Sequence, residues 1–199
     1  MKRNSVFAVI LACVLCLITG CTSTSNVPPP TIEPTPVVTV QPTESPTETP
    51  VSELTVHFID VGQADAAVLQ CGDDTMMIDG GNVADSSLIV AYLKKLNIDN
   101  IDYMVCTHAH EDHVGGLSAP LSVMPVSAVY APSAEADSKA YQNFKRKAAD
   151  QNTEIMHPEN YESFPFGSAR VEILACPDNA DNLNNTSIIL KVTHKNKSF

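Results

Sequence analysis

Three of the six histidines in this 199-residue chain fall within six consecutive positions, directly after a short apolar segment. The segment 102–107 (DYMVCT) is typical of a buried strand, and it runs straight into HAHEDH at 108–113. Imidazole and carboxylate groups are the ligands that zinc and similar divalent ions prefer in proteins. Ligands on a loop at a strand end leave coordination positions open more readily than a closed structural site does. The cluster therefore predicts a metal site with open positions.

The spacing of the cluster indicates how it would hold metal. In a chain that leaves the strand extended, His108, His110 and Asp112 alternate toward one side, so that two imidazoles reach one ion. Asp112 and His113 would face a second ion as the chain turns, and Gly115-Gly116 allows a tight bend close to the site. The alternative is a polar surface loop that holds these residues by chance. The apolar strand before the cluster and the glycine pair after it favour the metal site.

The rest of residues 53–199 shows the patterns of a mixed domain. Short runs of alternating or continuous apolar residues indicate strands, and apolar residues at helical spacing indicate two helices. We expect strands at 54–60, 66–70, 75–79, 102–107, 126–131, 170–175 and 187–194, and helices around 88–96 and 138–151. Strands interspersed with helices predict a layered α/β fold.

The first twenty residues are predicted to be an export signal. Two basic residues precede an apolar run at 6–18, which is short for a spanning helix and is followed by small residues. The segment 18–21 (ITGC) resembles the lipobox of bacterial lipoproteins, which implies that Cys21 is lipidated and becomes the mature N-terminus. The alternative is an uncleaved anchor helix. Both place the rest of the chain outside the cytoplasm, attached to the extracytoplasmic face of the cell membrane.

Residues 21–52 are dominated by threonine, serine and proline. Proline removes backbone donors and favours extended chain, so this segment is predicted to be a spacer between the membrane and a folded domain. The predicted organisation is therefore a lipoprotein signal peptide at 1–20, a linker at 21–52 after the lipidated cysteine, and one domain at 53–199.

The chain is strongly acidic. Without the two basic residues of the leader, ten basic residues face 23 acidic ones, which is a formal charge near −13. Such a charge gives little general attraction to phosphate backbones, and it disfavours nucleic acid as a substrate. The membrane, reached through the lipid anchor, is the one partner that the sequence indicates. It indicates no protein partner.

The histidines and cysteines elsewhere in residues 53–199 do not indicate a second site. Cys71, Cys106 and Cys176 form no CxxC pair, so a thiolate zinc site is not signalled, and a disulfide between two of them stays open. Cys106 lies in an apolar run and is predicted to be in the core. The remaining histidines are expected to be structural or solvent-facing: His57, His157 and His194.

The pattern His-x-His-x-Asp-His after an apolar strand resembles the signature of the metallo-β-lactamase superfamily. The segments 58–66 (FIDVGQADA) and 77–81 (MIDGG) are similar to the extracellular domain of ComEC-type DNA-uptake proteins and their stand-alone relatives, which usually have glycine where this chain has Ala64. The resemblance covers roughly residues 54–199. It implies a metallo-β-lactamase αββα sandwich.

The resemblance also implies a two-metal centre. His108 and His110 would bind one ion and Asp112 and His113 the second, with zinc as the expected metal at both positions and manganese as the alternative. In the superfamily, later segments add a third histidine, a bridging aspartate and a last histidine, and none of these is visible here. We therefore expect residues 53–199 to be the N-terminal two-thirds of the domain, incomplete at the C-terminus, with weakened metal binding.

Three further residues have implied roles. Asp112 would orient a metal-activated water or take its proton, as that water attacks a carbonyl carbon or a phosphorus. Asp79 and Asp65 would support the ligands from behind. If the domain is incomplete, apolar side chains of the last long strand, such as Ile188 and Leu190, are expected to be uncovered.

Three functions stay open. The first is an exported, ComEC-like, metal-dependent hydrolase that acts on phosphodiesters. The second is a non-catalytic or degenerate cell-surface metal-binding module, which the missing later ligands favour and the intact HAHEDH disfavours. The third is a lactonase, lactamase or thioesterase-type hydrolase. The resemblance implies that the chain is a hydrolase, whereas the missing ligands predict that it is a poor enzyme.

Overall fold

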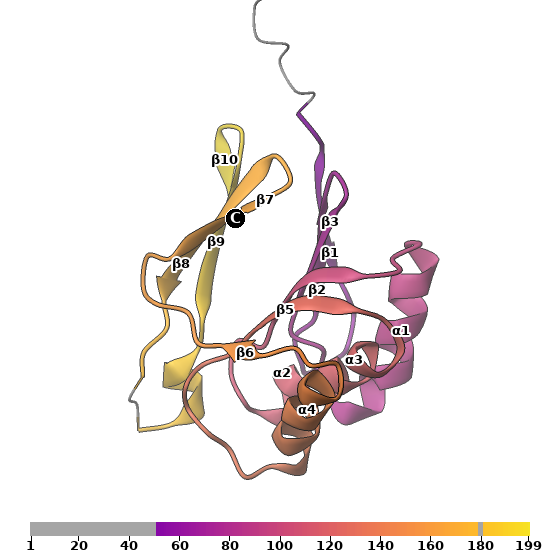
Figure 1. Cartoon of the computed structure of the whole chain (residues 1–199), viewed down its shortest axis with the longest axis vertical. Helices are drawn as coiled ribbons and strands as arrows, with labels where there is room; N and C mark the ends of the chain where they lie inside the picture. The colour runs from indigo at the N-terminus through magenta and orange to yellow at the C-terminus, as the bar shows by residue number, and fades with distance from the viewer. Residues whose placement is uncertain (1–50, 179–180) are drawn as a thin grey trace, which may run out of the picture. The chain divides into compact units, whose positions relative to one another are not determined.

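The computed structural model describes residues 51–178 and 181–199 (Figure 1). The predicted signal peptide, Cys21 and the linker as far as residue 50 lie outside the described residues. Within the described ranges, no helix has the length and apolar character that crossing a membrane requires.

The first sheet has six strands in the order β1-β2-β3-β4-β5-β6. Its first three strands form an antiparallel meander, and the tight turn between β2 and β3 contains Gly72, whose φ of +67° is in the left-handed region. From β3 to β6 the pairing is parallel. The strands are β1 (Leu54–Phe58), β2 (Ala67–Cys71), β3 (Asp74–Ile78), β4 (Ile101–Val105), β5 (Val126–Tyr130) and β6 (Ile155–Met156).

The second sheet has four antiparallel strands in the order β10-β9-β8-β7. The sequence predicted β8 and β9 but not β7, because Pro165 lies in the middle of β7 and a proline cannot donate to a ladder. It is accommodated because β7 is an edge strand. The strands are β7 (Ser163–Phe166), β8 (Ala169–Ala175), β9 (Ile189–His194) and β10 (Lys197–Ser198).

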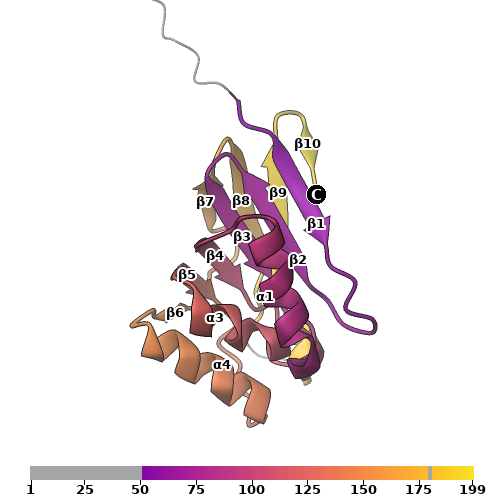
Figure 2. The ribbon, with the colours of Figure 1, turned by 90° about the vertical axis from the view of Figure 1, so that its right-hand side faces the viewer.

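The α-helices lie on the face of the first sheet that points away from the second sheet, as Figures 1 and 2 show. The layers are therefore helices, six-stranded sheet and four-stranded sheet, and the predicted mixed α/β fold is confirmed. Helix α4 begins where the Ser138 hydroxyl accepts a hydrogen bond from the Tyr141 amide at 3.2 Å. The helices are α1 (Ser86–Lys95), α2 (Glu111–Val114), α3 (Pro120–Val123) and α4 (Lys139–Asp150), with 3₁₀ turns η1 (Val83–Asp85), η2 (Gly115–Ser118) and η3 (Leu183–Thr186).

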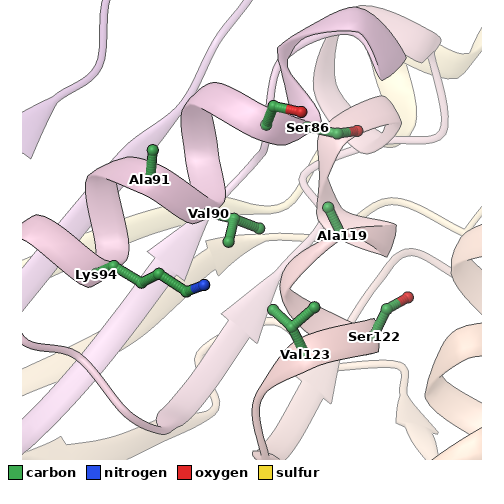
Figure 3. Close-up of a pocket in the computed structure, with 8 residues that line it drawn as sticks. Ser86, Val90, Ala91, Lys94, Ala119, Ser122 and Val123 are labelled. Atoms are coloured by element: carbon green, nitrogen blue, oxygen red, sulfur yellow. The ribbon is translucent and has the colours of Figure 1, made fainter.

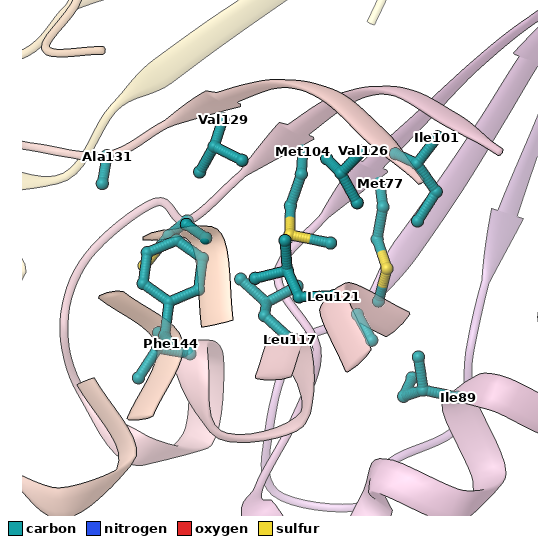
Figure 4. Close-up of a cluster of buried hydrophobic side chains, with 14 of the residues drawn as sticks. Met77, Ile89, Ile101, Met104, Leu117, Leu121, Val126, Val129, Ala131 and Phe144 are labelled. Atoms are coloured by element: carbon teal, nitrogen blue, oxygen red, sulfur yellow. The ribbon is translucent and has the colours of Figure 1, made fainter. Parts of the chain in front are cut away.

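Two apolar clusters hold these layers together. Between the helices and the first sheet, side chains such as Met77, Met104 and Phe144 are completely buried (Figure 4). Between the two sheets, Tyr103 and Tyr130 both stack on Phe164, with ring centroids 4.7 and 5.3 Å apart. Aromatic stacking adds to the apolar area that the sheets bury against each other.

The cluster between the sheets corrects one expectation from the sequence. Ile188 is buried and Leu190 packs partly buried against the cluster, although both were expected to be uncovered. The first sheet covers the face on which they lie. Leu174 and Ile189 are the exposed apolar residues of β8 and β9 instead. The buried position predicted for Cys106 is confirmed, and all three cysteines of the described residues are free thiols.

The turn that follows β3 packs backbone to backbone against the segment that follows α2. The Gly80 amide donates to the His113 carbonyl at 2.7 Å, and the Gly116 amide donates to the Gly81 carbonyl at 3.1 Å. A Cβ atom on Gly116 would come within 2.0 Å of the Gly80 carbonyl oxygen, so there is no room for a side chain. The glycines therefore let two loops meet at the place where the histidine cluster lies.

We predict that Gly116→Ala destabilises the domain by about 3 kcal/mol, because the backbones of both loops must separate to admit the methyl group. The matched control is Gly62→Ala: Gly62 has a φ of +69° but no atom within 4 Å of its ideal Cβ. Gly62→Ala should lower the free energy of unfolding by about 1 kcal/mol, because an alanine in the left-handed backbone conformation is strained. Urea unfolding of both variants measures the difference, and equal losses would contradict the close contact.

Candidate metal centre

The histidine cluster begins where β4 ends and spans the start of a short helix. His108 is buried, and His110 is the last residue with extended backbone, at φ −72° and ψ 150°. Helix α2 begins at Glu111, so Asp112 and His113 lie in its first turn. The prediction that Asp112 continues an extended alternation with His108 and His110 is therefore wrong. The helix instead divides the predicted ligands into two groups.

The first group is formed by His108 and His110. The Nε2 atom of His108 is 3.1 Å from the Nδ1 atom of His110. Two nitrogens that bind one tetrahedral zinc ion at about 2.0–2.1 Å are roughly 3.3 Å apart, so this pair is spaced as two ligands of one ion. The side-chain oxygen of Asn184, from η3, lies 2.9 Å from the same His110 Nδ1.

The second group surrounds the Nε2 atom of His113. Carboxylate oxygens of Asp65 and Asp112 lie 3.7 and 4.0 Å from this nitrogen. The backbone fixes this arrangement, because the Asp65 amide donates to the Asp112 carbonyl at 3.1 Å. Asp65 was predicted to be a supporting residue. The structure places its carboxylate among the predicted ligands, with 76% of the side chain exposed.

Asp79 supports the cluster from inside the fold. It is 3% exposed and has a φ of 54°, which is uncommon for a residue with a side chain. Its carboxylate accepts hydrogen bonds from the Thr107 amide at 2.7 Å and the Thr107 hydroxyl at 2.6 Å, and it lies 2.8 Å from His113 Nδ1. Its own amide donates to the Val105 carbonyl at 2.9 Å. These contacts place Asp79 behind the cluster, and its role in supporting a bound metal stays a prediction.

The protonation of two histidines follows from these contacts. The hydrogen bond to Asp79 raises the pKa of His113 above its usual value, although burial opposes it. Burial lowers the pKa of His108, and the neighbouring His113 lowers it further. Because a proton on His113 Nδ1 is bonded to Asp79, the Nε2 atom is the one that faces Asp65 and Asp112.

The cluster opens into a surface pocket of about 410 Å³. Its wall includes Asp65, His108 and His113 together with Ser187 from the loop before β9 and Phe58, whose side chain is 84% exposed. Sequence reasoning did not assign Phe58 or Asn184 to the site. The only signal for Phe58 was that it lies in the segment 58–66, which carries part of the family resemblance, and no local pattern indicated Asn184.

A second hollow, of about 460 Å³, lies between α1 and α3 (Figure 3). Small and aliphatic side chains line most of it, with the Lys94 ammonium at one side. It contains none of the predicted site residues, and its hydroxyl and apolar lining offers no metal ligands of the usual kind. The chemistry of the described residues is therefore concentrated at the histidine cluster.

The side chains of the cluster are of the kinds that bind divalent metals, but each of its two groups contains few of them. Among residues 51–178 and 181–199, no three histidine, cysteine, aspartate or glutamate side chains gather tightly enough to count as a metal site. What is present is a pair of imidazoles and, beside it, one imidazole flanked by two carboxylates. Neutral imidazole and carboxylate oxygen are suitable ligands for zinc, iron and manganese.

Fold and site together define a layered α/β domain with a histidine–carboxylate cluster at a strand end. The chain belongs to the metallo-beta-lactamase superfamily, whose family model matches residues 59–162, just over half of its length. This is a family of metal-dependent hydrolases, whose members bind divalent metals, typically zinc or iron. No curated protein matches the chain significantly.

Solved structures of the same fold are similar in part. A metallo-beta-lactamase with a HARLDQ motif from Cronobacter sakazakii is 19% identical with a TM-score of 0.50, covering 70% of this chain and 55% of that chain. A mutant of the same protein is 18% identical with a TM-score of 0.50, covering 70% of this chain and 56% of that chain. The metallo-beta-lactamase fold protein YhfI from Bacillus subtilis is 15% identical with a TM-score of 0.48, covering 74% of this chain and 58% of that chain. This chain thus spans little more than half the length of these structures, and the likeness concerns the fold.

We predict that Asp79→Asn lowers the pKa of His113 in the metal-free protein, because the amide cannot hold a protonated imidazole as the carboxylate does. Because the pKa of His113 is higher in the folded than in the unfolded chain, the Asp79–His113 ion pair stabilises the fold fully below about pH 6.5. This stabilisation is lost as the pH rises through the raised pKa of His113. Histidine NMR titration of the metal-free chain measures the shift. Asp99→Asn, at an exposed residue, is the control, and an unchanged His113 pKa in Asp79→Asn would refute the prediction.

Proposed function

We propose that this domain is an exported, ComEC-like, metal-dependent hydrolase that acts on phosphodiesters. One observation carries the proposal. The segment 58–66, on which the ComEC-like resemblance rests, folds so that Asp65 bonds to the Asp112 backbone and its carboxylate faces His113. The residues of the branch resemblance and those of the superfamily signature therefore belong to one site.

A divalent metal, zinc or manganese, bound there would lower the pKa of water and neutralise charge on a phosphoryl group. His108 and His110 would hold one ion. Asp112, whose side chain is 44% exposed, would orient the attacking water and accept its proton. Asp79 keeps His113 in one orientation, as described above.

The open pocket and the acidic chain favour a substrate that is a small phosphodiester, or one that is held only through its phosphate at the metal ions. The pocket is open to the surface, and the chain as a whole carries a formal charge of −11. A long nucleic acid would be repelled by such a surface, whereas two divalent ions would attract a phosphate locally. Phe58 at the rim offers an apolar surface to the group that the phosphate carries.

The proposal is tested with the full chain, loaded with zinc or manganese, on bis(p-nitrophenyl) phosphate, a short DNA and the lactam nitrocefin. We expect metal-dependent hydrolysis of bis(p-nitrophenyl) phosphate and at least about a 100-fold loss in His108→Ala/His110→Ala, since both ligands of one ion are removed. His57→Ala, on β1 outside the site, should retain activity.

Each other outcome decides against the proposal. Turnover of nitrocefin without phosphodiester hydrolysis would favour a lactamase-type hydrolase. Bound metal without any turnover would favour a non-catalytic cell-surface module. Equal activity in the double variant and the parent chain would show that the histidine cluster is not the site.

We also propose that Cys21, which lies outside the described residues, anchors the protein to the membrane through a lipid. In a bacterial host the chain should incorporate labelled palmitate and sediment with membranes, and Cys21→Ser should abolish the labelling. Cys16→Ser, within the same leader, is the matched control and should leave the labelling intact. A parent chain that sediments with membranes but incorporates no label would contradict the lipid anchor and favour the uncleaved anchor helix.

A further inference from the structure

We propose that the side-chain oxygen of Asn184 is a third metal donor, which joins His108 and His110 at the first metal position. The inference rests on the metal site of the proposed function and concerns a residue outside the histidine cluster. Asn184 Oδ1 is 2.9 Å from His110 Nδ1, although the two residues are 74 positions apart in the chain.

The fold holds Asn184 at this place. It belongs to the 3₁₀ turn η3, which begins where the Asn182 side chain accepts a hydrogen bond from the Asn185 amide at 3.2 Å. The Ser187 hydroxyl donates to the Asn184 carbonyl at 2.7 Å. The next residue, Ile188, is buried, and its amide donates to the Thr107 carbonyl at 2.9 Å. The turn is thus joined to the strand end that carries His108.

The contacts of His108 favour the tautomer that has its proton on Nδ1. The Thr107 hydroxyl donates to Asp79 at 2.6 Å, so its oxygen is free to accept the proton of His108 Nδ1, 3.2 Å away. In neutral imidazole the other ring nitrogen then carries a lone pair. This lone pair points toward His110 Nδ1, at 3.1 Å.

His110 Nδ1 therefore lies between two acceptors, His108 Nε2 and Asn184 Oδ1. A single proton on His110 Nδ1 would bond well to only one of them, and the other would face a group with no proton to share. A cation is attracted by all three lone pairs at once. The arrangement is satisfied by a metal ion better than by hydrogen bonds.

The nature of the third donor has a consequence for metal choice. An amide oxygen is a harder ligand than imidazole, and carbonyl oxygens suit manganese, magnesium and calcium, whereas imidazole suits zinc. Two imidazoles with one amide oxygen would therefore favour zinc less than three imidazoles would. A histidine at position 184 should shift the preference of the site toward zinc relative to manganese.

The test measures metal binding by the full chain in two ways. Competition with a chelator gives the affinities for zinc and manganese, and the visible absorption of bound cobalt reports on its ligands. We expect Asn184→Ala to weaken the first equivalent of metal by about tenfold or more, since outer ligand contacts alone are worth 10–100-fold. Asn184→His should bind zinc more tightly than the parent chain and change the cobalt spectrum. Asn185→Ala, the exposed neighbour on η3, is the matched control and should bind as the parent does.

Two results would overturn the inference. Parent-like affinity in Asn184→Ala would show that the amide is no ligand. Weaker binding in both Asn184 variants, with an unchanged cobalt spectrum, would show that Asn184 only orients His110 by a hydrogen bond. Failure of the proposed metal site itself is distinguishable, because the parent chain would then bind no metal before any variant is compared. Circular dichroism of each variant confirms that it is folded.

Discussion

The carboxylate of Asp79 is buried, and groups from two later segments of the chain bond to it. Such a charge is costly to remove from water unless its lone pairs are occupied, and here the Thr107 amide, the Thr107 hydroxyl and His113 occupy them. The same interactions join the end of β3 to the end of β4 and to the first turn of α2. The positions of both donor groups therefore depend on this one buried carboxylate.

From that point the site is built by close backbone contact. The glycines after β3 and after α2 bring two loops together without side chains between them, and the Asp65 backbone bonds to the Asp112 carbonyl. The predicted metal ligands lie at the surface of this contact. The buried partner Asp79 fixes the His113 ring, so this side chain has little freedom to lose when an ion binds. The exposed Asp65 and Asp112 side chains are fixed only at their backbone.

Much of this could be predicted from local patterns, and the failures have physical causes. Alternating and helical periodicities predicted the central strands and both long helices, and the apolar run before HAHEDH placed the cluster at a strand end. The helical turn at Glu111 was missed because four residues are too few to show a period. Edge strand β7 was hidden by Pro165, and the approach of Asn184 to His110 depends on tertiary packing that no local pattern contains.

The bond between the Ile188 amide and the Thr107 carbonyl sets one further property of the domain. It brings Thr107 and Ile188, which are far apart in the chain, to the same strand end, beside His110 and Asn184. An ion held by His110 and Asn184 would tie together two residues that are 74 positions apart. Because these two residues come together only in the folded chain, metal binding would stabilise the fold, and metal affinity and folding free energy would be thermodynamically linked.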